Sequence, residues 1–497
     1  MFKTFQSLLW QRRFLLLRFA FQLKILFFLS ILGSEIIGHQ ALAKYLTPND
    51  LSLTQKAFAE IDKKQWKNAL ATAARIKNPI AQDLIEWLDL IRPDSAFSFE
   101  RLNGFLSTHP NWPSQNTLRI KAEMAITDIL SPDFIIKWFS KYDPLTLVGS
   151  MKLAEAMFAK KMDKQAISML RNGWIKYNGT ESVEADFIAY YKNYLQPSDH
   201  NARLDRLLWD ENLEAAERML PFVDQTQQVL ARTRISLINN SINGVNMART
   251  IPANIRTAGL MYDLARWYRS QDQFPQAAQS LDPPPNFIPR PELFWPQLDN
   301  AARRALVRGD YQLAYRLAQG HGAPSGISFA EGEWLAGWIA LSYLHDAKRA
   351  FDHFTKLYNG VLTALSRSRA AYWAGLAADK MGDKATAQKW YNIGAAYPSA
   401  FYGQLSTARL NTKSLLNLSV LKKSGKTQKA AFDQGDLTKA ILILNDVSQE
   451  KRMQPFFLKL ADMAESEEEL QMIADLAKSL ALPKYSLMVA KQGRNKG

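Results

Sequence analysis

The sequence predicts an all-α protein, a superhelical α-solenoid of helical hairpins, and three observations support this fold class. Apolar residues recur at spacings of three and four along nearly the whole chain after Lys44, as in KLAEAMFAKKMDKQAISMLRNGW over 152–174. No run of alternating β-branched residues interrupts this periodicity. A short motif that joins two helices recurs along the chain, and its later copies are regularly spaced.

The first 43 residues differ in composition from the rest of the chain. A positive region with Arg12 and Arg13 precedes the short apolar stretch ILFFLSIL, and the small residues Ala41 and Ala43 mark a cleavage site. This layout predicts a secretory signal peptide at 1–43, cleaved after Ala43, and a periplasmic location. An uncleaved anchor is the alternative, but the apolar stretch is short for a span of about 20 residues. We expect no membrane span after cleavage.

The charge and the cysteine content limit the possible partners and chemistry. The chain has 62 Lys and Arg against 47 Asp and Glu, a formal charge of +15. A basic exported protein meets anionic lipids and cell-wall polymers. The charges are dispersed, without the basic and aromatic block used for single-strand binding, so nucleic acid is not expected as a partner. The sequence has no Cys, which excludes a disulfide framework, a thiolate metal site and a Cys nucleophile.

The motif that joins two helices has a steric explanation. A polar turn is followed by a bulky residue, two variable positions and an Ala. We expect the bulky residue to pack back on the preceding helix, and the small Ala to let that helix approach closely. Gly or Asn in the turn suits the left-handed backbone of many helix ends. The copies are Trp66–Ala69, Leu213–Ala216, Phe274–Ala277, Tyr311–Ala314 and Leu437–Ala440, with a variant after Gly382-Asp383.

The repeat becomes more regular after about residue 290. The helix-start positions Tyr311, Ala347 and Ala385 lie 36 and 38 residues apart, and Phe354 is echoed by Tyr391. Gly375, Ala387 and Tyr391 have the spacing of small and aromatic positions in a tetratricopeptide-like repeat. Single hairpins of this kind cannot bury their apolar faces, so they stack into a superhelix.

Two changes in composition divide the chain. The stretch LDPPPNFIPRPELFWP over 281–296 has six prolines and is interpreted as a connecting loop on the surface. A loose basic stretch begins near residue 411 and precedes a short helical tail. These changes predict a superhelical domain at 44–410 and a linker-like helical domain at 411–497.

Few residues suggest a catalytic or metal site. His345 and His353 are eight residues apart and do not match the i, i+4 spacing of a helical zinc motif, so no metal is expected. Glycan hydrolysis needs a buried carboxyl with a raised pKa. Glu331 and Glu333 are interpreted as a pair at a helix start, where carboxylates favour the helix dipole. No nucleotide or dinucleotide fingerprint appears, and no cofactor is expected.

Four stretches together resemble one family: PELFWPQLDNAARRALVRGDYQLAYRLA, FAEGEWLAGWIALSYL, SRSRAAYWAGLAADKMGD and YPSAFYGQLSTARL. They are similar to the soluble lytic murein transglycosylases. The likeness covers Leu51 to Leu410 and extends faintly to about residue 490. It implies a ring- or U-shaped superhelix of hairpins that precedes a small catalytic domain of goose-lysozyme type. In this reading Pro398 ends a repeat helix, Phe401-Tyr402 anchors the closing one, and Gly403 allows close helix approach.

The family reaction cleaves the bond between N-acetylmuramic acid and N-acetylglucosamine without water and leaves a 1,6-anhydro end. The family's catalytic domain opens with a Glu-Ser pair and a glycine-rich run. Glu181-Ser182 and Glu465-Ser466 lack that run. We therefore expect no catalytic domain and no catalytic residue in this chain, which then acts as a truncated or split form.

The expected role is a scaffold that binds peptidoglycan glycan strands, with a separately encoded catalytic domain as a further partner. The resemblance makes Arg367, Arg369, Tyr372 and Tyr402 candidate glycan contacts, while ordinary helix packing is the competing interpretation. A helical-repeat protein–protein scaffold in the periplasm is the alternative function, since solenoids bind peptides in a concave face. A remnant without function is the third possibility.

Overall fold

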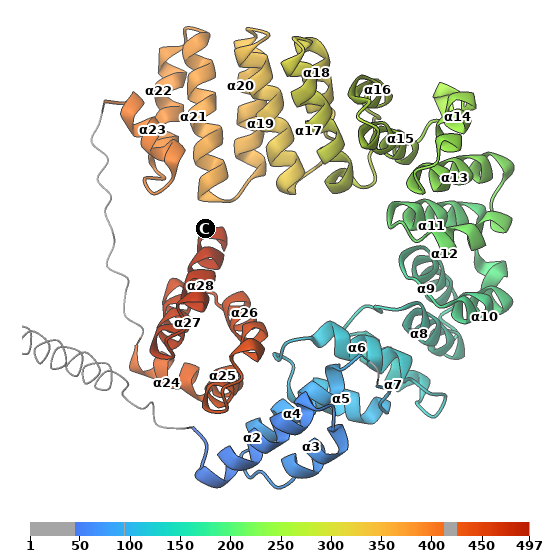
Figure 1. Cartoon of the computed structure of the whole chain (residues 1–497), viewed down its shortest axis with the longest axis vertical. Helices are drawn as coiled ribbons and strands as arrows, with labels where there is room; N and C mark the ends of the chain where they lie inside the picture. Colours follow the sequence, from blue (N-terminus) through green and yellow to red (C-terminus); the bar gives the residue numbers. More distant parts are fainter. Residues whose placement is uncertain (1–44, 94, 412–424, 497) are drawn as a thin grey trace, which may run out of the picture. The chain divides into compact units, whose positions relative to one another are not determined.

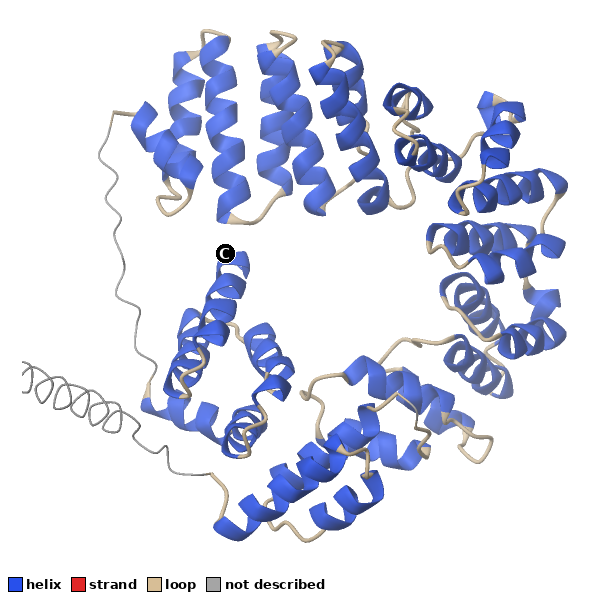
Figure 2. Cartoon of the chain, viewed as in Figure 1, coloured by secondary structure: helices blue, strands red, loops and turns tan. Residues whose placement is uncertain are grey.

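The computed structural model describes residues 45–93, 95–411 and 425–496, and every regular element in these ranges is a helix (Figure 2). The predicted all-α fold is confirmed. The signal peptide predicted at 1–43 lies outside the described residues. Within the described ranges, no helix is both long and apolar enough to cross a lipid bilayer.

The chain forms two compact units. The first unit contains residues 45–89 and 431–454 and joins segments far apart in sequence. The Leu46 amide donates to Asp446 at 3.2 Å, and Arg452 pairs with Asp62 at 2.9 Å while lying over the Phe58 ring. Its helices are α2 (Pro48–Asp62), α3 (Trp66–Ala73), α4 (Pro79–Ile91), α25 (Asp436–Asp446) and the 3₁₀ turn η4 (Glu450–Arg452). Helix α24 (Lys426–Gln434) precedes α25 and crosses the boundary between the two units.

The second unit contains the described residues of 90–430 and 455–496 and is a succession of helical hairpins. Hairpins α17/α18, α19/α20 and α21/α22 stand side by side (Figure 1). Its first half consists of α5 (Phe99–Thr108), α6 (Gln115–Met124), α7 (Pro132–Phe139), α8 (Leu147–Ala159), α9 (Asp163–Lys176), α10 (Glu181–Tyr191), α11 (Pro197–Trp209), α12 (Leu213–Met219), α13 (Gln225–Ile238), α14 (Ile242–Thr250), α15 (Ala258–Ser270) and α16 (Phe274–Ser280), with the 3₁₀ turns η1 (Lys192–Tyr194), η2 (Leu220–Phe222) and η3 (Ala253–Ile255).

The second half of this unit continues the hairpins and then adds three C-terminal helices. It consists of α17 (Pro291–Val307), α18 (Tyr311–Gln319), α19 (Gly326–Ser342), α20 (Ala347–Gly360), α21 (Ala364–Lys380), α22 (Lys384–Ala395), α23 (Phe401–Arg409), α26 (Gln454–Met463), α27 (Glu467–Ser479) and α28 (Pro483–Lys496).

The first helices of successive hairpins form a layer, which we call the first-helix layer: α11, α13, α15, α17, α19, α21 and α23, each in contact with the next. One apolar core runs beneath it from Trp209 to Ala377. A buried arginine, Arg234 on α13, binds carboxylates on two neighbouring helices of the layer. Its Nη1 lies 2.8 Å from Asp205 on α11 and its Nε 2.6 Å from Asp263 on α15. Because both carboxylates share one guanidinium, the three helices are held in register.

Four of the five predicted joins are confirmed at the helix starts, and in the fifth α25 begins one residue before Leu437. Helices α3, α12, α16 and α18 begin at the bulky residue of the motif, and the Ala one turn later is buried in each. In the hairpin turns the residue two positions before the second helix has a left-handed backbone. These residues are Lys64, Lys161, Glu211, Asn240, Asp272, Gly309, His345, Gly382 and Ala481. The expectation of Gly or Asn there holds only for Asn240, Gly309 and Gly382.

This turn geometry predicts opposite effects for two substitutions. Gly382 has φ +81°, and a methyl group there would meet open space, so Gly382→Ala adds only backbone strain. We expect a loss of about 1 kcal/mol. Lys161→Gly relieves the same strain at φ 58° and is expected to be neutral or slightly stabilising. Urea titration of both variants measures the change in the free energy of unfolding. An unchanged unfolding midpoint for Gly382→Ala would contradict the prediction.

The tetratricopeptide-like part is confirmed in α19–α22. A Cβ added at Gly337 would lie 2.7 Å from the Phe354 ring, and one added at Gly375 would lie 2.7 Å from the Tyr391 ring. Each first helix thus has a glycine against which the aromatic ring of the second helix packs. The same small-and-aromatic pair recurs in consecutive hairpins, as the spacing predicts.

Two local interpretations are wrong. The proline-rich stretch 281–296 is a loop only up to Arg290, because α17 begins at Pro291 and contains Pro296. Pro291 is tolerated in the first turn, where its missing N–H has no intrahelical acceptor, whereas Pro296 lies inside the helix and removes one of its hydrogen bonds. Phe401 does not anchor α23, since 62% of its surface is exposed.

Candidate functional site

Three of the four candidate glycan contacts lie together on the first-helix layer. With their neighbours they form what we call the aromatic–arginine stripe: Trp295 of α17, Glu331 and Trp334 of α19, Arg369 and Tyr372 of α21, and Tyr402 of α23. Trp295 is buried, Glu331 is exposed, and the other four side chains are half-buried. The stripe therefore crosses four consecutive helices of the layer and reaches solvent.

Arg369 is the charged centre of the stripe. Its guanidinium lies 5.2 Å from the centre of the Trp334 ring. Burial lowers the pKa of Arg369, while the nearby Tyr402 and Glu331 act in the opposite direction. The Nε of Arg369 and the indole N–H of Trp334 are buried without a partner among the described residues. A half-buried cation that keeps unused donors is suited to bind oxygen acceptors of a ligand.

The tyrosines extend the stripe onto the last hairpin. The rings of Tyr372 and Tyr402 lie 5.6 Å apart, and Arg409 Nη2 lies 3.5 Å from the Tyr372 hydroxyl. At the other end of the stripe, Glu331 of α19 is linked to Trp295 of α17, because its Oε2 accepts a hydrogen bond from Trp295 Nε1 at 2.9 Å. Flat rings next to polar groups can hold the apolar face of a sugar and hydrogen-bond its hydroxyls.

Arg367 lies apart from the stripe. Its Nε donates to the Val361 carbonyl at 3.0 Å, and its guanidinium lies 5.5 Å from the Tyr358 ring of α20. Two residues along a helix turn a side chain by roughly 200°, so Arg367 and Arg369 face different sides of α21. The structure thus groups Arg369, Tyr372 and Tyr402 and separates Arg367 from them.

Glu331 and Glu333 both lie within α19 and not at its start, and Glu333 is the buried one of the two. Glu333 is 1% exposed and accepts hydrogen bonds from two histidines, which corrects the expectation. His321 Nε2 lies 3.0 Å from Oε1 and His353 Nδ1 2.7 Å from Oε2. His321 Nδ1 accepts the Ala323 amide, so its Nε2 carries the proton that Glu333 accepts. Lys356 Nζ adds a contact at 2.5 Å from an exposed position.

These contacts make Glu333 a poor general acid. Burial alone raises the pKa of a carboxyl, but hydrogen bonds from His321, His353 and Lys356 outweigh it and hold the pKa of Glu333 well below its usual range. A proton donor for glycoside cleavage needs the opposite shift. No cluster of three or more His, Asp or Glu in the described part of the chain is arranged to hold a metal ion.

Glu123 is a second buried carboxylate, and it holds the two residues that precede α8. Burial raises its pKa, while bonds from the Thr146 hydroxyl and the Leu145 amide act against that shift. Its oxygens lie 2.7 Å from Thr146 Oγ1 and 2.8 Å from Leu145 N, at the start of α8. A Cβ at Gly149 would lie 2.3 Å from Glu123 Oε2, so the site is closed to a substrate.

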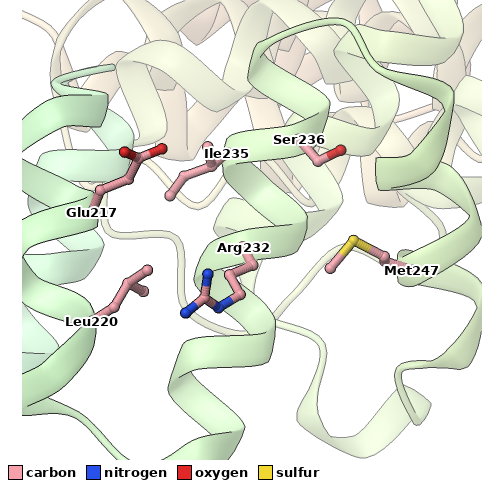
Figure 3. A pocket seen from close by; sticks show the side chains of 6 residues that line it. All are labelled: Glu217, Leu220, Arg232, Ile235, Ser236 and Met247. Atoms are coloured by element: carbon pink, nitrogen blue, oxygen red, sulfur yellow. The ribbon is translucent and has the colours of Figure 1, made fainter.

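A groove of about 400 Å³ lies between neighbouring hairpins in the second unit. Glu217 and Leu220 face Arg232 and Ile235 of α13, and Met247 contributes from α14 (Figure 3). The buried Leu220 and Ile235 form its apolar part, while Glu217 and Arg232 are exposed. No residue of the aromatic–arginine stripe lines this groove.

Sequence reasoning missed the roles of Trp295, Trp334 and His321. Trp295 and Trp334 recur near the spacing of the hairpins, as Trp334 and Trp373 do, and this signal could have marked the stripe. His321 has no such signal, because it lies in a loop 12 residues from its partner Glu333.

Comparisons with known proteins agree on the fold. No family model and no curated protein sequence matches the chain. The 70-kDa soluble lytic transglycosylase of Escherichia coli matches with a TM-score of 0.52 and 15% identity, over 90% of this chain and 70% of that one, and its complex with bulgecin A gives the same values. An inactive mutant of the Pseudomonas aeruginosa lytic transglycosylase Slt matches with a TM-score of 0.60 and 14% identity, over 88% and 70%. The predicted resemblance is confirmed at the level of fold: the chain has a soluble lytic transglycosylase-like fold.

Proposed function

We propose that this chain is a scaffold of the lytic transglycosylase type that binds the glycan strands of peptidoglycan through the aromatic–arginine stripe. The observation that carries the proposal is the alignment of Trp334, Arg369, Tyr372 and Tyr402 across consecutive helices of the first-helix layer. Neighbouring rings and a guanidinium on consecutive helices match a polymer that repeats sugar faces and peptide-stem carboxylates. The fold of the Escherichia coli and Pseudomonas aeruginosa enzymes supports the same polymer as ligand.

The proposed role is binding rather than bond cleavage. Among the described residues, Glu333 has a lowered pKa and Glu123 is packed against Gly149 and closed to a substrate, so neither supplies the acid that the family reaction needs. We propose that a separately encoded catalytic domain performs the cleavage. We also propose a leader at 1–43 that is cleaved after Ala43, a periplasmic location, a superhelical domain at 44–410 and a linker-like domain at 411–497.

Co-sedimentation of residues 44–497 with purified sacculi tests the binding. We expect Arg369→Gln to weaken binding about tenfold, which corresponds to about 1.4 kcal/mol. Arg367→Gln is the matched control, because it removes the same charge from the same helix but on another side, and it should bind as the unchanged protein does. Equal losses in both variants would indicate non-specific charge attraction.

Two other outcomes separate the alternatives. Absence of co-sedimentation would contradict the proposal and favour the protein–protein scaffold. Mass spectrometry of the supernatant provides the second readout. Release of 1,6-anhydro muropeptides would show that the chain cleaves glycan by itself, and the proposed restriction to binding would then be wrong.

A further inference from the structure

A polar cavity of about 220 Å³ lies between the C-terminal end of α13 and α15, outside the aromatic–arginine stripe. Its polar lining comes from Asn240, Asp263, Arg266, Trp267 and Ser270, and its apolar lining includes Leu237. The cavity is smaller than the roughly 300–1,000 Å³ of sites for drug-sized molecules. Its size suits a ligand of one ring.

The charges of the cavity are already balanced within the protein. Asp263 accepts from Arg234 Nε at 2.6 Å, and Arg266 pairs with Glu211. A bound anion or cation would have to compete with these pairs and lose its hydration. The cavity therefore favours a polar ligand without net charge.

Hydrogen-bonding groups in the cavity remain unused. Trp267 is 7% exposed, and its indole N–H is buried without an acceptor in the described part of the chain. Asn240 accepts from Ser270 and Gln271 through Oδ1, each at 3.3 Å, and this leaves its amide N–H groups for other acceptors. The Trp267 nitrogen is itself covered by protein, so Trp267 offers the cavity its apolar ring, and the free donors come from Asn240.

We propose that this cavity is a subsite for a single uncharged sugar ring, with Asp263 and Asn240 as hydroxyl partners and Trp267 as an apolar wall. A pyranose presents donors and acceptors around an apolar ring, as the mixed lining requires. Carboxylate, amide and indole groups at one small site meet those demands together. That the ring belongs to a peptidoglycan strand rests on the proposed function, whereas the preference for a neutral ring rests on the cavity alone.

The test is a titration of the intact chain with the tetramer of N-acetylglucosamine, followed through the indole N–H resonances of tryptophan by NMR. Trp267→Phe assigns the resonance of Trp267. We expect that resonance to shift at millimolar sugar. We also expect Asp263→Asn to weaken the apparent affinity at least fivefold, provided that circular dichroism shows an unchanged fold. A sugar that binds elsewhere would leave the Trp267 resonance in place.

Trp209 gives the matched control. It is also buried with an unpartnered indole N–H, on α11, but it does not line the cavity, so Trp209→Phe should leave the titration unchanged. A Trp267 resonance that stays fixed up to saturating sugar would overturn the proposal and leave a cavity that holds water only. If sacculi bind and Trp267 does not respond, the subsite is wrong and the stripe stands. If Trp267 responds and sacculi do not bind, the proposed function is wrong and the subsite stands.

Discussion

Glu333→Gln is expected to lower the free energy of unfolding by about 3 kcal/mol, because it removes a buried acceptor shared by His321 and His353. His353 also forms a hydrogen bond with the Tyr315 hydroxyl at 2.8 Å, so the loss of stability should affect α18 as well as α19 and α20. Lys356 is 63% exposed, so solvent screens its contact with Glu333 and its contribution to the free energy of unfolding is small. Urea or thermal unfolding measures the effect.

The same variant should change the response to acid. A carboxylate whose pKa is lowered by folding contributes stability above its ordinary value of 4.5, and this contribution is lost as the pH falls toward the folded pKa. Below pH 4.5 the unchanged protein should therefore lose stability more steeply than Glu333→Gln. Glu331→Gln, on the exposed side of the same helix, is the control and should cost less than about 1 kcal/mol. Parallel pH profiles for Glu333→Gln and the unchanged protein would contradict the assignment.

Gly403→Ala is expected to displace α23 from the preceding hairpin. A Cβ at this position would lie 1.9 Å from the Tyr397 carbonyl oxygen and 3.1 Å from that of Gly394. Both are backbone atoms, so no side-chain rotation can relieve the clash, and the cost should be on the order of 3 kcal/mol. Hydrogen exchange should accelerate in α23 and the end of α22 but not in α11–α15, since hairpins in a solenoid depend on their neighbours.

Gly104→Ala provides the control for Gly403→Ala. Gly104 lies within α5, and a Cβ there would meet nothing within 4 Å. This variant should gain about 0.5–1 kcal/mol, because alanine loses less entropy than glycine in a helix. Since Tyr402 adjoins Gly403, the Gly403→Ala variant should also bind sacculi more weakly. Normal exchange in α23 of Gly403→Ala would show that the close approach is absent.

The parts of the fold that sequence predicts are local. The join Tyr311–Ala314 and the pairs Gly337–Phe354 and Gly375–Tyr391 depend on residues of one hairpin, so their spacing in the chain is their spacing in the helix pair. Aromatic and small residues at fixed intervals therefore predict both the helix starts and the packing of α19–α22.

The parts that sequence does not predict depend on contacts between hairpins or beyond. Leu46 and Asp446 lie 400 residues apart, and no periodicity links them. Glu333 looks like one of two glutamates at a helix start, and only the fold brings His321 and His353 to it from a loop and from α20. Arg367 and Arg369 look equivalent in sequence, and the orientation of α21 alone separates them.

The shared guanidinium of Arg234 has a mechanical consequence. Helices α11, α13 and α15 are joined there by directional bonds to a buried charge, whereas the stripe residues of α19, α21 and α23 meet through the Arg369–Trp334 and Tyr372–Tyr402 ring contacts. Under tension from a bound polymer, α11, α13 and α15 should stay rigid relative to one another, and bending should concentrate at α19, α21 and α23. A strand held at the aromatic–arginine stripe would then be held on the compliant part of the protein, which can follow the strand while the arginine-linked part keeps its form.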